Sequence, residues 1–427
     1  MKTNEHTWAD LVTSASRLDA NDTLKDFKSQ FYQADPNEIY LDGNSLGRMP
    51  LETQRKLEDI IETQWGCGLI RSWGEHWYDA PTRIGDKLAG LIGAEPGEVI
   101  IADSTTINLF KLVISALTLN ANRKEIISDV LNFPTDLYTI RGALAMLNRG
   151  HELVLLESSN GVKISMDDYQ QALSENTALV TFSTPTFKSG FLHDIPMMTS
   201  LAHEAGALVL WDFSHAVGVI PLDLNRWDVD FAVGCTYKYL NGGPGSPAFL
   251  YVHPKHLVNI GHQPLGWWGH QTPFTFDLAY QPADSIRRTL TGTPPVLSLL
   301  PIEIGVDLVQ NAGIEAIREK SQQLGNLFVQ AFDQRLAGLG YQLGSPRDDS
   351  QRGGHVSIRH PEAYRIYQAL THELKLIPDF REPDNIRLGF APLYTSFRDV
   401  LEAVTRLAQA VEAQLYEKYS HERARVT

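Results

Sequence analysis

The chain has 427 residues and a formal net charge of −14, from 37 basic and 51 acidic side chains. Its length predicts two or three domains, and 43% hydrophobic with 21% charged residues is ordinary for a folded globular protein. The acidic balance argues against a broad surface for nucleic acid or anionic membrane.

The first part of the chain is expected to form a large domain around a sheet. Residues 1 to about 38 are polar helical material that leads into a short strand and turn at residues 39–47. Beyond them, short apolar runs alternate with helical periodicity, which predicts a mostly parallel sheet with helices on both faces. The expected strands are residues 99–101, 125–128, 153–156, 178–182 and 207–211, with a strand at 248–252 that could return antiparallel.

A smaller α+β domain is expected to follow. A long helix from about Pro301, broken near Gly313, leads into strands at 355–358 and 386–388 and a final helix from about Phe397. We therefore expect three regions. They are an N-terminal segment (1–40) that packs on the small domain, a large α/β domain (41–300) and a small C-terminal domain (301–427).

Lys238 is the most informative residue of the chain. It lies on a short turn before the glycine-rich residues 242–245, and the strand 207–211 delivers Asp212 at its C-terminal end. An amine and a carboxylate so placed are typical of enzymes that hold pyridoxal phosphate (PLP). The lysine forms a Schiff base with the aldehyde, and the carboxylate keeps the pyridine nitrogen protonated. The glycines match neither a P-loop nor a dinucleotide fingerprint.

Further polar segments follow the expected strands, where ligands collect in open α/β sheets. Residues 104–106 (Ser-Thr-Thr) open a helix, which suits either a phosphate group or a plain N-cap. Residues 133–136 (Phe-Pro-Thr-Asp) suit ring stacking and a hydrogen bond to the cofactor, or a turn with Asp as N-cap. In residues 212–215 (Asp-Phe-Ser-His), the carboxylate could be another N-cap, and the histidine is either an interior residue or a support for the carboxylate or cofactor.

Composition predicts a reduced compartment and no metal site. The chain has only two cysteines, Cys67 and Cys235, and its 14 histidines show no ligand spacing. Residues 1–10 lack the apolar core of a signal peptide, and no apolar run approaches the roughly 20 residues needed to cross a bilayer. We therefore expect a cytoplasmic protein without nucleic-acid or membrane partners.

The chain resembles the kynureninase family, whose members are fold-type I PLP enzymes of the class V aminotransferase group. The resemblance implies the fold-type I PLP-dependent transferase-like fold. It also implies hydrolysis of L-kynurenine or 3-hydroxy-L-kynurenine to L-alanine and anthranilate or 3-hydroxyanthranilate, by Cβ–Cγ cleavage, in tryptophan catabolism or NAD precursor synthesis. The segments that carry it are residues 40–47, 133–136, 211–218, 237–245, 266–270 and 385–387.

The resemblance also implies roles for single residues. Lys238 is the Schiff-base lysine, Asp212 the partner of the pyridine nitrogen, and Tyr237 a proton donor or a phosphate contact. Ser45 falls in the substrate pocket, and Arg387 clamps the substrate's α-carboxylate, for which a guanidinium fork is well shaped. The cofactor-binding set is Thr105, Thr106, Phe133, Asp136, Ser183, Asp212, His215, Tyr237, Lys238, Trp267 and Thr293.

Two of these residues imply that the protein is a homodimer. Trp267 and Thr293 match positions that reach the phosphate of the neighbouring subunit, which implies a homodimer with shared sites. Adjacent tryptophans flanked by glycines in a polar stretch are also large apolar surfaces that a monomer rarely leaves exposed, with core packing as the alternative.

Two other functions have less support in the sequence. Cysteine desulfuration needs a nucleophilic cysteine on a mobile loop of the C-terminal half, but Cys235 directly precedes the lysine turn and Cys67 lies early in the chain. A cofactor-bound but inactive binding protein is the other alternative, which the sequence leaves open but does not favour, since Lys238, Asp212 and Arg387 are all present. The sequence leaves open the preference between the two kynurenines, the pathway served and the residues that line the aromatic pocket.

Overall fold

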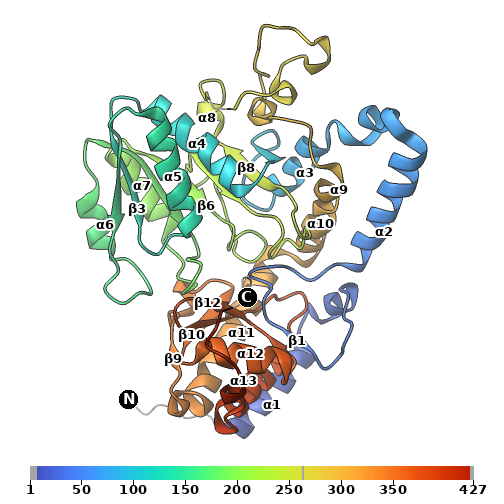
Figure 1. Cartoon of the computed structure of the whole chain (residues 1–427), viewed down its shortest axis with the longest axis vertical. Helices are drawn as coiled ribbons and strands as arrows, with labels where there is room; N and C mark the ends of the chain where they lie inside the picture. The colour runs from blue at the N-terminus through green and yellow to red at the C-terminus, as the bar shows by residue number, and fades with distance from the viewer. Residues whose placement is uncertain (1–6, 262–263, 424–427) are drawn as a thin grey trace.

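The protein is described by a computed structural model that covers residues 7–261 and 264–423. Figure 1 shows a larger body built around one sheet and, below it, a smaller body that contains the C-terminal helices. Helix α1 (Trp8–Asn21), at the start of the described chain, packs on α13 (Phe397–Glu412) of the smaller body.

The large body contains a seven-stranded sheet in the order β2-β8-β7-β6-β5-β3-β4. Strand β8 alone runs opposite to the other six strands, so its pairs with β2 and β7 are antiparallel and the other pairs are parallel. This is the strand at residues 248–252 that could return antiparallel. The strands are β2 (Val99–Ala102), β3 (Glu125–Asp129), β4 (Glu152–Leu156), β5 (Thr177–Ser183), β6 (Leu208–Asp212), β7 (Phe231–Gly234) and β8 (Ala248–Val252).

Helices cover both faces of this sheet because successive strand residues point to opposite sides. On β5, Leu179 packs in the cluster that contains α4 and α5, whereas Val180 packs in the cluster that contains α3 and α7. Both faces are therefore apolar, which explains the continuous apolar runs of the sequence. The helices are α2 (Leu51–Asp59), α3 (Ala80–Ala89), α4 (Thr105–Leu119), α5 (Pro134–Leu147), α6 (Met166–Ala172), α7 (Ile195–Glu204), α8 (Pro254–Leu257) and α9 (Val296–Leu299).

The small body is an antiparallel sheet, in the order β12-β13-β10-β9, packed against helices. The N-terminal segment belongs to its core, because Leu11, Ala15 and Ile39 are buried in the same cluster as Phe328 and Val404. The elements are β1 (Ile39–Tyr40), β9 (Gln342–Leu343), β10 (His355–Arg359), β11 (Leu376–Ile377), β12 (Asp379–Arg381), β13 (Asn385–Gly389), α11 (Ile314–Arg335), α12 (Ala363–His372) and α13.

The expected broken helix is confirmed. Helix α10 (Ile302–Ala312) ends at Gly313, whose φ of +79° favours glycine, and α11 begins at the next residue. Among the described residues, no single helix is long and apolar enough to cross a membrane. The segment 296–312 and α11 pass such a test only together, as a pair bent by 82°.

Several elements were not expected from the sequence. Strands β9, β11 and β12 have two or three residues, too few to show a periodic pattern, and β7 is a four-residue run just before the lysine turn. Residues 60–77 contain two π-helical segments, Ile60–Gly68 and Trp73–Trp77, within the projecting arm that begins with α2.

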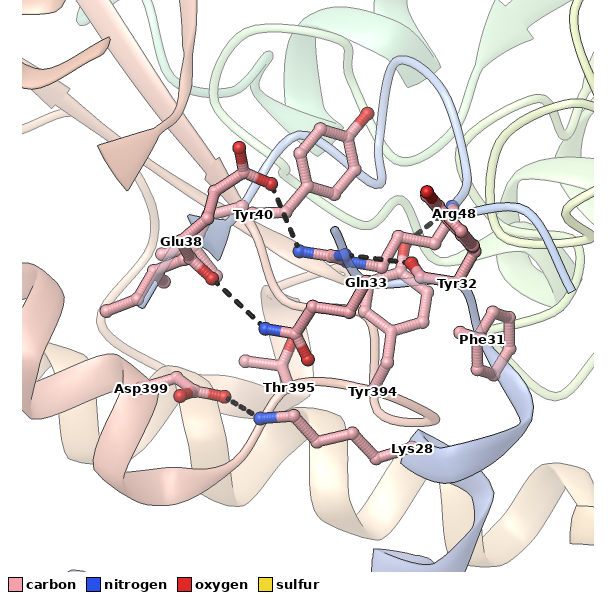
Figure 2. A pocket seen from close by; sticks show the side chains of 12 residues that line it. Lys28, Phe31, Tyr32, Gln33, Glu38, Tyr40, Arg48, Tyr394, Thr395 and Asp399 are labelled. Atoms are coloured by element: carbon pink, nitrogen blue, oxygen red, sulfur yellow. Dashed lines mark hydrogen bonds and ion pairs between the residues drawn. The ribbon is translucent and has the colours of Figure 1, made fainter. Parts of the chain in front are cut away.

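Arg48 joins the N-terminal segment to the loop that carries residues 42–47. Its guanidinium donates to the Tyr32 carbonyl oxygen at 3.1 Å, and its Nη2 lies 3.6 Å from the Glu38 carboxylate. It also stacks over the rings of Tyr40 and Tyr394, and Figure 2 shows these side chains converging on it. These contacts fix the loop from the side of the small body.

Two glycines allow other segments of the same chain to touch the backbone of the turn that carries Lys238. The Gly47 amide donates to the Tyr237 carbonyl oxygen at 2.7 Å, and a Cβ at Gly47 would overlap the Lys238 carbonyl oxygen. A Cβ at Gly305 on α10 would overlap the Leu240 carbonyl oxygen. Any larger residue at either position would displace the turn that carries Lys238.

Gly305→Ala should therefore lower the free energy of unfolding by about 2–3 kcal/mol, because the added methyl group meets rigid backbone. Gly142, on α5, is a matched control, since a Cβ there meets nothing within 4 Å. Gly142→Ala should raise the free energy by up to about 1 kcal/mol through helix propensity. Urea denaturation of both variants measures the difference, and equal effects would contradict the close contact at Gly305.

Candidate active site

A cavity of about 210 Å³ lies where the N-terminus of α4 meets the C-terminal end of β6 and the lysine turn. It brings together every cofactor residue expected from the sequence except Ser183, Trp267 and Thr293. Its lining is Ser104, Thr105, Thr106, Phe133, Thr135, Asp136, Asp212, Ser214, His215, Tyr237, Lys238, Ser246 and Ala248.

Asp212 is held rigidly at the end of β6. Its Oδ1 accepts hydrogen bonds from the Ser214 amide at 2.8 Å and the Ser214 hydroxyl at 2.6 Å, and its carbonyl oxygen accepts from the Thr184 amide. The alternative that Asp212 is an N-cap is wrong, because no helix begins there. Ser214 was not singled out from the sequence, although it lies within the motif that contains Asp212.

Lys238 and His215 form a hydrogen-bonded pair, with Nζ 2.8 Å from Nε2. Burial, and then the charge of Lys238, lower the pKa of His215 well below its ordinary value, so the imidazole is neutral and can accept from the amine. Burial also lowers the pKa of Lys238. A lowered pKa favours the neutral amine that a nucleophile or general base requires.

Asp136 lies beside Asp212 in the same cavity. Burial, followed by the neighbouring Asp212 carboxylate, raises the pKa of Asp136 well above its ordinary value, which favours the neutral acid. Asp136 was alternatively expected to be an N-cap, but the first turn of α5 has no side-chain cap. That alternative is wrong.

The N-terminus of α4 is built to receive an anion. Ser104 is the N-cap, since its hydroxyl accepts from the Ile107 amide at 3.4 Å, so the capping alternative is correct for this residue. Thr105 and Thr106 follow at the first two helical positions and line the cavity. The free N–H groups and the helix dipole place partial positive charge there.

The residues of this cavity fit pyridoxal phosphate. Among the described residues, the buried Nδ1 of His215 and Oγ of Ser183 have no hydrogen-bond partner. Ser183 lies next to Asp212 in the register of β5 and β6, just outside the lining. Phe133 is 41% exposed and packs edge-on against Phe187, which leaves an aromatic surface at the cavity. The phosphate group, the pyridine ring and the aldehyde of pyridoxal phosphate would each have a chemically suitable side chain in or beside this cavity.

Ser45 and Arg387, the expected substrate residues, also meet. Arg387 on β13 is fully buried, and its Nη2 donates to the Ser45 hydroxyl at 3.1 Å. Asp379 and Arg381 on β12 surround this pair and were not predicted from the sequence. The only signal was their position just before the segment that contains Arg387.

Trp267 and Thr293 lie outside the cavity. Trp267 is 39% exposed and lines a separate hollow with other residues between 265 and 280, and Thr293 is exposed. Trp268, which follows Trp267 in the sequence, is buried and packs on Trp73 and Tyr78. The core-packing alternative therefore holds for one tryptophan of the pair.

Neither cysteine serves this cavity in the described part of the chain. Cys235 is buried, and burial raises the pKa of its thiol, whereas Cys67 is exposed on the projecting arm. The described residues also include no group of three or more His, Cys, Asp or Glu side chains suited to a metal ion.

A buried lysine connects the α4 N-terminus to residues 289–291. The Lys111 amine pairs with the Asp103 carboxylate and donates to the Thr289 carbonyl oxygen at 2.7 Å. The other Asp103 oxygen accepts from the Thr291 hydroxyl at 2.9 Å. Asp103 directly precedes the cap residue Ser104, so this network braces the N-terminal end of α4.

Lys111→Met should lower the free energy of unfolding by about 3 kcal/mol, because it leaves the Asp103 carboxylate without its buried cation. Lys87 is a matched control, since its amine pairs with Asp307 and Glu303 but its side chain is 36% exposed. Lys87→Met should cost less than about 1 kcal/mol. Chemical denaturation compares the two, and a loss at Lys87 as large as at Lys111 would argue against the buried network.

Comparisons with known proteins agree with this geometry. Residues 317–407 match the family model "Kynureninase C-terminal domain". The chain is 42% identical to a kynureninase of Pseudomonas fluorescens over 93% of this chain and 95% of that protein. It is 43% identical to a kynureninase of Burkholderia pseudomallei (strain 1106a) over 97% of each chain.

Solved structures share the fold at low identity. A cysteine desulfurase from Thermococcus onnurineus NA1 superposes with a TM-score of 0.78, 16% identity, and coverage of 91% of this chain and 98% of that one. A C-DES variant with glycine covalently linked to its PLP cofactor gives a TM-score of 0.77 at 18% identity, over 87% and 97%. These likenesses confirm the fold-type I architecture. Because relatives above 40% identity match almost the whole of both chains, this chain belongs to the kynureninase family.

Proposed function

We propose that this protein is a PLP-dependent hydrolase that converts L-kynurenine to anthranilate and L-alanine, or the 3-hydroxy substrate to 3-hydroxyanthranilate and L-alanine. The observation that carries the proposal is the single cavity that joins the Lys238 amine, the Asp212 carboxylate and the open N-terminus of α4. Family membership over nearly the whole chain supports the substrate.

Pyridoxal phosphate, when bound, supplies an electron sink for the carbon atoms that gain negative charge during cleavage. Thr105, Thr106 and the first N–H groups of α4 would hold its phosphate, and Phe133 would pack on its ring. Asp212 would hold a proton at the ring nitrogen, and its bonds from Ser214 keep the carboxylate in one orientation. We propose Asp136, Ser183 and His215 as the remaining cofactor contacts from this subunit.

Lys238 would anchor the cofactor and remove the proton from the substrate's α-carbon. Its pKa is lowered by burial, so more of the amine is neutral than for a lysine in water. Tyr237 lines the same cavity, and its pKa is raised by neighbouring Cys235 and by burial. A phenol that keeps its proton suits a proton donor at the leaving carbon, and a phosphate contact is the alternative role.

The substrate's α-carboxylate would lie at the junction of the large and the small body. Arg387 from the small body and Ser45 from the N-terminal loop meet there, and the Phe187 carbonyl oxygen of the large body accepts from Arg387. We propose that this junction binds the α-carboxylate. We also propose the division into residues 1–40, 41–300 and 301–427, with the first region packed on the third.

We further propose a cytoplasmic homodimer whose sites are shared, without nucleic-acid or membrane partners. Two projecting segments support it, the arm after α2 and the loop of residues 264–280 (Figure 1). Large apolar side chains of this kind are a signature of protein interfaces. Those exposed are Ile61, Trp65, Leu69, Ile70, Leu265, Trp267, Phe274, Phe276 and Leu278.

The reaction is tested by mixing the purified protein and PLP with each kynurenine and following the aromatic product. The wild type should release anthranilate or its hydroxy analogue, and Lys238→Ala should lower kcat at least about 10³-fold because it removes the base and the anchor. Borohydride should fix the cofactor on Lys238 of the wild type. Absence of product from both substrates, or labelling of another lysine, would contradict the proposal.

Shared sites are tested by complementation between two inactive variants, Lys238→Ala and the double variant Trp267→Ala/Thr293→Ala. Random pairing makes half of the dimers mixed, and each mixed dimer has one intact site of two. Co-refolding should therefore recover about a quarter of the wild-type rate. No recovery from verified mixed dimers, or a monomer in sedimentation, would contradict sharing without touching the role of Lys238.

A further inference from the structure

The Arg387 guanidinium has few donors left for a substrate. Its Nε and Nη2 both donate to Asp379 Oδ2, Nη2 also donates to Ser45, and Nη1 donates to the Phe187 carbonyl oxygen. A guanidinium has five N–H groups, so a single one, on Nη1, lacks a partner among the described residues. A two-point carboxylate bond needs two parallel N–H groups. Arg387 in this arrangement can supply only one.

Arg381 lies against the same cluster and has donors to spare. Its Nη1 is 3.1 Å from Asp379 Oδ1 and donates to the Phe380 carbonyl oxygen, and its Nη2 is 3.5 Å from the Ser45 hydroxyl. Within residues 7–261 and 264–423, its Nε has no hydrogen-bond partner. The Arg381 side chain is 32% exposed against 2% for Arg387, so a ligand can reach it.

The two guanidiniums are therefore neighbours with a shared anchor. Both Nη2 atoms approach the one Ser45 hydroxyl, and the two oxygens of Asp379 are divided between them. Both guanidiniums also act on the Lys238 amine. Burial is the largest cause of the lowered pKa of Lys238, and the positive charges of Arg387 and Arg381 lower that pKa as well. The cluster thus lies within electrostatic reach of the cavity where the substrate's α-carbon must sit.

We propose that Arg381 is a second carboxylate-binding residue of the substrate site, and that Asp379 positions both guanidiniums for it. The substrate's α-carboxylate is held between the remaining N–H of Arg387 and the unpartnered N–H groups of Arg381. Asp379 is a positioning residue, because its carboxylate spaces two like charges that would otherwise repel. The inference rests on the proposed function, in which the ligand is an α-amino acid.

The test compares ligands with and without the carboxylate. In the Lys238→Ala background loaded with PLP, binding of L-kynurenine and of its decarboxylated analogue kynuramine is titrated by cofactor absorbance without turnover. Adding Arg381→Met should raise the Kd of L-kynurenine about 10- to 100-fold and leave that of kynuramine within about twofold. Asp379→Asn should weaken L-kynurenine selectively as well.

Arg359→Met is the matched control, because this arginine also lies in the small sheet but pairs with Asp384. It should change neither Kd beyond about twofold. Arg381→Lys, which keeps the charge but loses the planar fork, should give an intermediate loss, and it decides the question if Arg381→Met does not fold.

Equal weakening of both ligands, or no change in either, would overturn the role of Arg381. The proposed function fails separately, if the wild type with PLP releases no aromatic product from either kynurenine.

Discussion

The backbone of residues 236–242 is approached so closely from two sides that only glycine fits, and the active site depends on this contact. Gly47 brings the N-terminal loop onto the Lys238 carbonyl oxygen, and Gly305 brings α10 onto that of Leu240. The turn itself is closed by the Gly242 amide, which donates to the Thr236 carbonyl oxygen. Lys238 is thus fixed by packed backbone on either side. A covalent anchor for a cofactor needs such rigidity, because small displacements at a reacting atom are costly in rate.

This contact also explains why the small body matters to a site built mostly by the large one. The loop that ends at Gly47 begins at β1, which pairs with β11 of the small body, and Arg48 ties it to Tyr394 (Figure 2). Ser45 lies in the middle of the loop and touches Arg387. The segment that carries Ser45 is therefore held by the small body at one end and by the lysine turn at the other. Any change in the relative position of the two bodies would therefore act on both Ser45 and the lysine turn.

The large sheet and the Lys238–Asp212 pair could be predicted from the sequence because both are local signals. Apolar runs such as residues 178–182 mark strands buried on both faces, and a strand end followed by Asp212 marks the ligand edge. The substrate cluster could not be predicted in this way. Ser45 and Arg387 are 342 positions apart, and only resemblance to a family joined them. Asp379 and Arg381 occupy a three-residue strand without periodicity, and the Lys111 network depends on contacts up to 188 positions apart that no local pattern reports.

The same fold serves cysteine desulfurases, so the choice of reaction must lie in side chains rather than in the architecture. The cavity around Lys238 supplies what any PLP enzyme needs, namely an anion site, a carboxylate for the ring nitrogen and an amine. Within the described residues, it lacks the thiol that would accept sulfur, because Cys235 is buried behind the turn and Cys67 is on the projecting arm. What remains specific is the junction of two guanidiniums, Asp379 and Ser45. In the function that we propose, this junction would select an amino acid by its α-carboxylate and leave the aromatic end of the ligand to other surfaces. In the homodimer that we propose, the exposed apolar segments near Trp267 would supply such a surface from the second subunit, and assembly would then be part of substrate recognition.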